Sequence, residues 1–198
     1  QDYKTAVKWY KLAAEQGNAF AQYNLGMMYG TVDAVKNHKK ALKWLKRSSK
    51  QGNAKAQAIM GNFYARGQNV PRDYKTAVEW YRRAAEQGHA PAQTSLAVMY
   101  GTGQGVRQNH KTAAKWYRLA AEQGYIPAQA SLGVMYGTGQ GVRQDNVYAH
   151  MWGNIAASRG NVGGRRLLDL VVNQMTPDQI VLAQQMAQRC VEKKFKGC

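Results

Sequence analysis

The chain has 198 residues and is strongly basic, with 28 Lys and Arg against 11 Asp and Glu, a formal net charge of +17. It contains no run of about 18 apolar residues, which excludes a membrane-spanning helix. The charge bears on partners and solubility rather than on the fold. Because the chain opens at Gln1 directly on a predicted helix cap, we expect a fragment or a processed product, and its start gives no information on targeting.

Three kinds of residue recur along the chain with one spacing of 35 or 36 residues. These columns are Trp9, Trp44, Trp80, Trp116 and Trp152; Gly17, Gly52, Gly88, Gly124 and Gly160; and Asp2, Asn37, Asp73, Asn109 and Asp145. Three columns in step indicate a repeat protein, in which each unit contacts only its neighbours. We expect units at about 1–36, 37–72, 73–108 and 109–144, and the first helix of a last unit at 145–160. Residues 161–198 would then form a degenerate last helix, a capping helix and a tail bounded by cysteines.

The unit 73–108 predicts two helices joined by a tight turn. Asp73 is a good N-cap, and the apolar residues that follow it repeat with the 3.6-residue period of an amphipathic helix. Gly88 marks the end of the first helix, and Pro91 fits the first turn of the second. The fold class is therefore all-α, a solenoid of about five such units. We interpret the tryptophan and tyrosine columns as core rather than as a ligand cage.

A glycine-rich loop follows the second helix twice, as GTGQGVRQN at 101–109 and GTGQGVRQD at 137–145. A phosphate-binding loop would need a strand before it, whereas here a helix precedes. We therefore predict a connector, with Val106 and Val142 packed between units.

Thr176, Pro177 and Gln179 form the pattern of an N-cap, an N1 proline and a capping-box residue. The helix that they open is predicted to run to about Cys190 and to close the last apolar face of the solenoid.

The two cysteines, Cys190 and Cys198, lie outside the repeats. Their spacing can close a small disulfide loop, and free thiols are the alternative. A zinc site would need further ligands, and no histidine follows His150. An oxidised pair would indicate a periplasmic or secreted protein, and reduced thiols a cytoplasmic one.

The chain resembles the Sel-1-like repeat family, relatives of the tetratricopeptide repeats. The resemblance rests on AVEWYRRAAEQG at 77–88 and AQTSLAVMYGTGQGVRQN at 92–109, and on their counterparts at 113–124 and 128–145. It covers roughly residues 1–160 and implies a right-handed α–α superhelix that acts as a scaffold or adaptor, often in bacterial secretion, envelope or host contact. A cysteine-rich branch of the family has pairs with the spacing of Cys190 and Cys198, although it carries them in each repeat.

Each first helix places basic residues opposite its apolar side on a helical wheel. The four sets are Lys4, Lys8 and Lys11; Lys39, Lys43 and Lys46; Lys75, Glu79 and Arg82; and Lys111, Lys115 and Arg118. Eleven of these twelve positions are basic. The resemblance implies that first helices line the concave surface, so a cationic groove for an acidic protein segment is the leading hypothesis. A solvated face that serves only solubility is the alternative.

Two other classes of function are weaker. Loose binding of RNA or another polyanion is the second hypothesis, but the aromatic columns lie on the buried side and are unavailable for stacking on bases. An enzyme is the third, and the chain has no paired carboxylates or Ser–His arrangement. Two of its histidines, His38 and His110, occupy a column that holds tyrosine in other units. We expect no cofactor, no metal, no small-molecule substrate and no membrane span.

Overall fold

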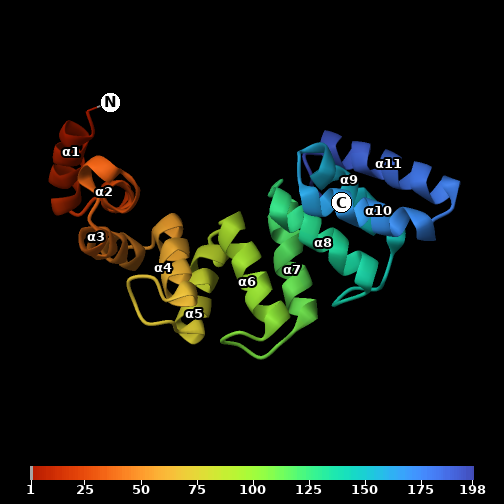
Figure 1. The fold of residues 1–198 in the computed structure, drawn as a ribbon, viewed down its shortest axis with the longest axis horizontal. Helices are drawn as coiled ribbons and strands as arrows, with labels where there is room; N and C mark the ends of the chain where they lie inside the picture. The colour runs from red at the N-terminus through yellow and green to blue at the C-terminus, as the bar shows by residue number, and fades with distance from the viewer. Residues whose placement is uncertain (1) are drawn as a thin grey trace. The chain divides into compact units, whose positions relative to one another are not determined.

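The structure, a computed structural model, describes residues 2–198, which form α-helices and short loops and no strand. The first helices of the repeats are α1 (Tyr3–Glu15), α3 (His38–Lys50), α5 (Tyr74–Glu86), α7 (His110–Ala121) and α9 (Asn146–Ser158). The second helices are α2 (Ala19–Thr31), α4 (Ala54–Arg66), α6 (Ala90–Thr102), α8 (Ile126–Thr138) and α10 (Val162–Val171). Two 3₁₀-helices, η1 (Asp33–Val35) and η2 (Val172–Gln174), and the terminal α11 (Pro177–Glu192) complete the chain (Figure 1). The predicted all-α repeat fold is confirmed.

The chain divides into two compact units, Gln1–Ala92 and Gln93–Cys198, with the boundary inside α6. In the first unit, α1 packs on α2, α2 on α3, α3 on α4, and α4 on α5. In the second unit, α7 packs on α8, α8 on α9, and α9 on α10. A second helix thus contacts the first helix of the following repeat, which makes the core continuous from repeat to repeat within each unit. Among the described residues, no helix is both long and apolar enough to cross a membrane.

The predicted caps hold the ends of the helices. The Asp73 carboxylate accepts hydrogen bonds from the backbone N–H groups of Lys75 and Thr76 at 3.0 and 3.2 Å. The Thr76 hydroxyl also donates to it at 2.6 Å, and these hydrogen bonds lower the pKa of Asp73. At the other end of α5, Gly88 has a φ of +83°, a left-handed conformation that glycine adopts at least cost. The caps and glycines therefore recur with the period, because a cap begins the first helix of each repeat and a glycine follows its end.

A column of buried glutamines links the helices within and between repeats. Gln57 donates through Nε2 to the carbonyl of Ser49, at the end of the preceding first helix, at 3.2 Å. Its own Oε1 accepts from Gln87 of the next repeat at 2.7 Å. The pattern recurs at Gln22, which donates to Ala14 and accepts from Gln51. Buried amides are tolerated here because their hydrogen bonds are satisfied.

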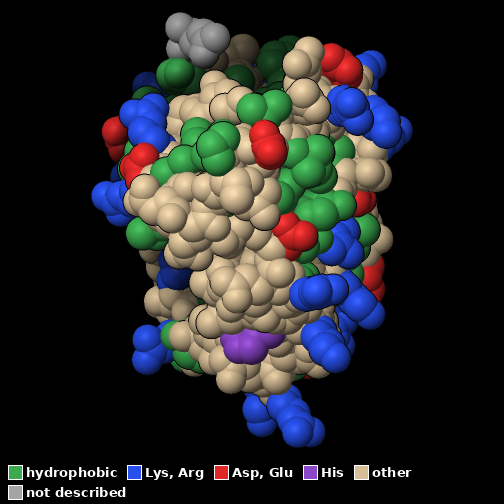
Figure 2. All heavy atoms as spheres, turned by 90° about the vertical axis from the view of Figure 1, so that its right-hand side faces the viewer, with side chains coloured by type: hydrophobic (Ala, Val, Ile, Leu, Met, Phe, Trp, Pro, Cys, Tyr) green, Lys and Arg blue, Asp and Glu red, His purple; other side chains and the backbone are tan. Residues whose placement is uncertain are grey.

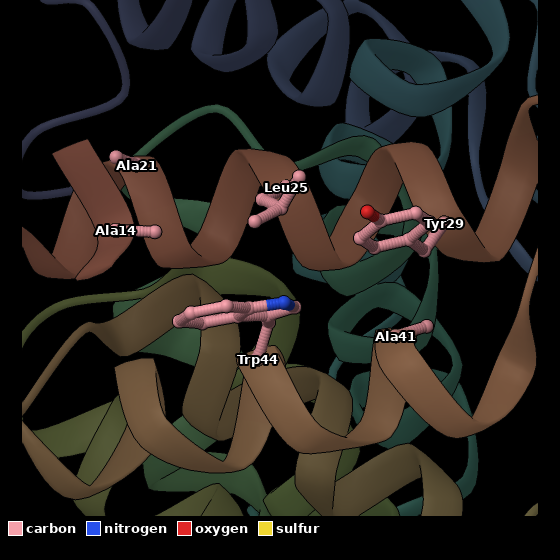
Figure 3. Packing of buried hydrophobic residues seen from close by; sticks show 6 residues of the cluster. All are labelled: Ala14, Ala21, Leu25, Tyr29, Ala41 and Trp44. Atoms are coloured by element: carbon pink, nitrogen blue, oxygen red, sulfur yellow. The ribbon is translucent and has the colours of Figure 1, made fainter. Parts of the chain in front are cut away.

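The tryptophan column is only partly interior. Trp44 is 6% exposed, because it packs on Ala14, Leu25 and Tyr29 of the preceding repeat (Figure 3). Trp152 is equally enclosed, at 1%. The prediction that the whole column is core is wrong for Trp9, which is 65% exposed, since no described helix precedes α1 to cover it.

The terminal helix begins as predicted, with the Thr176 and Gln179 side chains each bonded to the other's backbone N–H. It packs on α9, the first helix of the fifth repeat. On α10, Val162 and Leu170 stay open to solvent, at 62% and 68% exposed. The apolar face that the terminal helix covers is therefore a face of α9.

Candidate interaction surface

The twelve positions of the four basic sets, hereafter the basic triplets, are all exposed. Three triplets lie in the first unit, on α1, α3 and α5, and the fourth lies on α7 in the second unit. Their members are Lys4, Lys8, Lys11, Lys39, Lys43, Lys46, Lys75, Glu79, Arg82, Lys111, Lys115 and Arg118. They are exposed because the small residues of the same helices, such as Ala41 and Ala113, face the core. The first helices α1, α3, α5 and α7 therefore each present a basic stripe to solvent.

Local contacts orient some of these cations without neutralising the stripe. Lys11 lies 3.7 Å from the carboxylate of Glu15 one turn away, an exposed pair of the kind that contributes little. The Lys43 ammonium lies 5.8 Å from the centre of the Trp44 ring. Arg118 donates to the Tyr136 hydroxyl at 2.8 Å. Because eleven of the twelve positions are basic and the twelfth is Glu79, the stripes keep a net positive charge.

The fifth repeat breaks the basic pattern. Thirty-six residues after Lys111, Lys115 and Arg118 stand Val147, Met151 and Asn154 on α9. Met151 is only 1% exposed, because α11 covers this side of α9.

The residues around the α9–α11 contact show how the two helices meet. Met186, Arg189 and Cys190 of α11 line a hollow together with Met151, and Ala187 lines another with Asn154. Sequence reasoning missed this contact. The signal was present, since apolar residues stand in the lysine column at 147 and 151.

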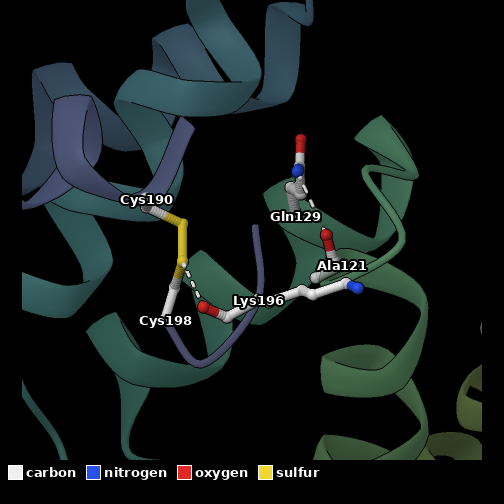
Figure 4. Close-up of a disulfide and its surroundings, with 5 residues drawn as sticks. All are labelled: Ala121, Gln129, Cys190, Lys196 and Cys198. Carbon is white, nitrogen blue, oxygen red and sulfur yellow. Dashed lines mark hydrogen bonds between the residues drawn. A yellow bond between two sulfur atoms is a disulfide. The ribbon is translucent and has the colours of Figure 1, made fainter. Parts of the chain in front are cut away.

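The cysteines are joined in a disulfide, with sulfur atoms 2.06 Å apart and Cα atoms 5.6 Å apart (Figure 4). The tail that follows α11 lies beside the turn between α7 and α8. There Arg159 donates to the carbonyl of Gly124 at 2.7 Å, and its guanidinium lies 5.5 Å from the centre of the Phe195 ring. Arg159 also donates to Gln129, so it takes the place that a glutamine holds in the earlier repeats. The disulfide and this contact fasten the C-terminal end of α11.

The face that carries α10 and α11 differs from the basic stripes. Figure 2 shows hydrophobic, neutral and acidic side chains over its middle, with Lys and Arg toward its edges in this view. Exposed apolar residues here include Leu170 on α10 and Val181 and Leu182 on α11.

Hollows on the side of the second helices recur with the period. One of about 490 Å³ lies beside Gly30, His38 and Phe63 in the first unit. One of about 310 Å³ lies beside Thr102 and His110 in the second. His38 and Ala41 line the first hollow, and His110 and Ala113, which stand 72 residues after them, line the second. The two hollows therefore lie at equivalent positions of two repeats.

The histidines occupy separate places. Burial lowers the pKa of His89, and the nearby Lys55 charge lowers it further. Burial also lowers the pKa of His150. Within residues 2–198, no three His, Cys, Asp or Glu side chains gather in a group that could hold a metal ion.

A family model described as the Sel1 repeat matches residues 1–18, 19–53, 54–89, 90–125 and 126–161. The chain belongs to the Sel1 repeat family. The first match covers α1 alone. The other four begin at a second helix and end after the next first helix, half a unit out of phase with our division and with the same period. Sel1 repeats generally act in protein–protein interaction, on scaffolds that are generally not enzymes. No curated protein matches the sequence.

Solved structures resemble the chain over most of its length. A protective antigen of uropathogenic Escherichia coli with an SLR fold is 35% identical, with a TM-score of 0.87, over 96% of this chain and 42% of the antigen. The chain thus spans less than half of that protein. A Sel1 repeat protein from Oxalobacter formigenes is also 35% identical, with a TM-score of 0.81, over 100% of this chain and 80% of the other. Helicobacter pylori cysteine rich protein B, 24% identical with a TM-score of 0.52 over 64% of this chain and 92% of its own, shares the fold.

Proposed function

We propose that the chain is a protein-binding scaffold whose basic triplets take an acidic segment of the partner. The observation that carries the proposal is the contrast between repeats. The stripe is basic and exposed on α1, α3, α5 and α7, and it is apolar on α9, where the chain covers it with α11. Lysine and arginine on an open, repeated face steer an acidic partner and form charge-assisted hydrogen bonds with its carboxylates.

The disulfide supports a site of action outside the reducing cytosol. Disulfides persist in the periplasm and in secreted proteins, whereas cytosolic thiols are kept reduced. We therefore place the chain in the periplasm or outside the cell. A count of reactive thiols in freshly isolated native material tests this placement, since two reactive thiols would contradict it.

The binding test removes charge from the triplets of the first unit without weakening their helices. The variant Lys8→Gln, Lys43→Gln and Lys46→Gln loses three charges and keeps residues of similar helix propensity. Its control, Lys36→Gln, Lys55→Gln and Arg66→Gln, loses three exposed charges that lie outside the triplets. A fluorescein-labelled glutamate-rich peptide is titrated against the full chain at low and at near-physiological salt, and fluorescence anisotropy gives the affinity.

We expect the triplet variant to bind the peptide at least about fivefold more weakly, with a shallower salt dependence, and the control to bind like the parent. Unchanged affinity and salt dependence in the triplet variant would show that the stripe serves solubility alone. A parallel titration with single-stranded poly(U) addresses the polyanion alternative. RNA binding near physiological salt that exceeds peptide binding would overturn the protein-partner proposal.

A further inference from the structure

The terminal helix shows what can lie on the outer side of a first helix. One face of α11 is buried, with Ala183, Ala187 and Cys190 at 0%, 5% and 3% exposed. These residues follow one another at intervals of four and three, the spacing of a single helical stripe. They lie against α9, where Met151 and Ile155 are each 1% exposed. The chain therefore already contains a helix docked on this face.

The α11 helix does not occupy the position of a sixth first helix. In the repeats, a first helix packs on the second helix that precedes it, as α3 does on α2 and α9 on α8. By contrast, α11 packs on α9. It thus lies on the side of a first helix that remains open to solvent in the earlier repeats.

The docking face of α9 and the open face of α7 have the same helical register. Both helices begin after a side-chain N-cap, Asn109 for α7 and Asp145 for α9, and the caps stand 36 residues apart. The α9 residues Val147 and Met151 correspond to Lys111 and Lys115 of α7. The same correspondence joins α9 to the triplets of α1, α3 and α5 in the first unit. The difference lies in the chemistry, apolar on α9 and cationic on the other first helices.

We propose, on the basis of the protein-binding function above, that the partner segment docks on the basic triplets as an acidic α-helix, laid along a first helix as α11 is laid along α9. Three of the four triplets place cations at i, i+4 and i+7, and the α5 triplet, which has Glu79 at i+4, places them at i and i+7. Each row is about 10 Å long along the helix axis. A helix with Asp or Glu at the same spacing sets a carboxylate opposite each cation. Small residues beside those carboxylates, like Ala183 and Ala187 in α11, allow close approach.

Two synthetic peptides of equal length and charge test the helical form. The first has 16 residues, with Glu at the first, fifth, eighth and twelfth positions and Ala and Gln elsewhere, and it favours a helix. The second differs by one central Ala→Pro change, which disfavours the helix by about 3 kcal/mol and leaves the charge unchanged. Both are titrated against the full chain, and against the triplet variant (Lys8→Gln, Lys43→Gln and Lys46→Gln) and its control (Lys36→Gln, Lys55→Gln and Arg66→Gln).

We expect the helix-forming peptide to bind at least about tenfold more tightly than the proline peptide, and to lose that advantage in the triplet variant but not in the control. Equal binding of both peptides, lost in the triplet variant, would overturn the helical form and leave the acidic-partner function standing. Failure of both peptides to bind would overturn both proposals. A second variant, Lys111→Gln, Lys115→Gln and Arg118→Gln, removes the triplet of α7. An advantage lost in either variant supports docking on that triplet, and an advantage that survives in both would overturn this inference.

Discussion

Helices α7 and α9 are equivalent elements of consecutive repeats, and they differ in what their outer faces do. Their inner columns are alike, with Ala113 and Ala149 both at most 1% exposed. On the outer face, Lys115 of α7 is open to solvent, whereas Met151 of α9 is covered by α11. The comparison shows that the inner columns build the repeat, and that the outer face can change between a basic surface and a packing surface without altering the helix.

The largest expected effect comes from exchanging the two outer residues. Met151→Lys places an ammonium group under α11 with no partner, and we expect a loss of about 3 to 5 kcal/mol in the free energy of unfolding, or release of α11. Lys115→Met changes an exposed position, and we expect a change within about 0.5 kcal/mol. Urea unfolding monitored by tryptophan fluorescence, with amide exchange of α11, measures both. A Met151→Lys chain that keeps its stability and the protection of α11 would contradict the equivalence of the two faces.

The next largest effect is expected from removing the disulfide that fastens α11 over α9. Replacing Cys190 and Cys198 together by alanine removes a short closed loop, and we expect a loss of about 2 to 3 kcal/mol. Amide exchange should increase in α11 and the tail, and remain unchanged in the first unit, which the disulfide does not touch. Exchange that is unchanged in α11 would mean that the packing of Ala183 and Ala187 holds the helix in place without the covalent link.

Much of the fold follows from the sequence because the repeat is local. Caps such as Asp73, stops such as Gly88 and the periodic apolar stripes act within one or two turns of helix, so their spacing predicted the helices of every unit. The helical wheel of the first helices likewise predicted that the basic triplets are exposed.

The remaining features depend on contacts between distant segments. The glutamine column was visible in the sequence, but a buried amide is explained only by partners such as Ser49 and Gln87, which folding brings to Gln57. The position of α11 on α9 rests on the direction of the chain after η2, which no period encodes. The exposure of Trp9 likewise depends on a neighbouring repeat, since the residue itself is the same as Trp152.

The smallest expected effect concerns His150, which stands where α7 has Ala114. His150 is buried, its Nδ1 atom has no hydrogen-bond partner, and burial lowers its pKa. The unfolded chain, with a histidine pKa of about 6.5, therefore binds the proton more readily than the folded one. The stability that His150 contributes is present above about pH 6.5 and is lost as the pH falls through the lowered pKa of the folded state.

His150→Ala places alanine at the position where α7 has Ala114. We expect this variant to lose less stability than the parent as the pH falls from about 7 to about 5. Urea midpoints at these two pH values measure the difference for His150→Ala and for a matched variant, His89→Ala. Burial also lowers the pKa of His89, so His89→Ala should reduce the sensitivity to acid in the same direction, but from the first unit. If the urea midpoint of His150→Ala changes with pH as that of the parent does, the buried imidazole does not account for any difference in acid stability between α9 and α7.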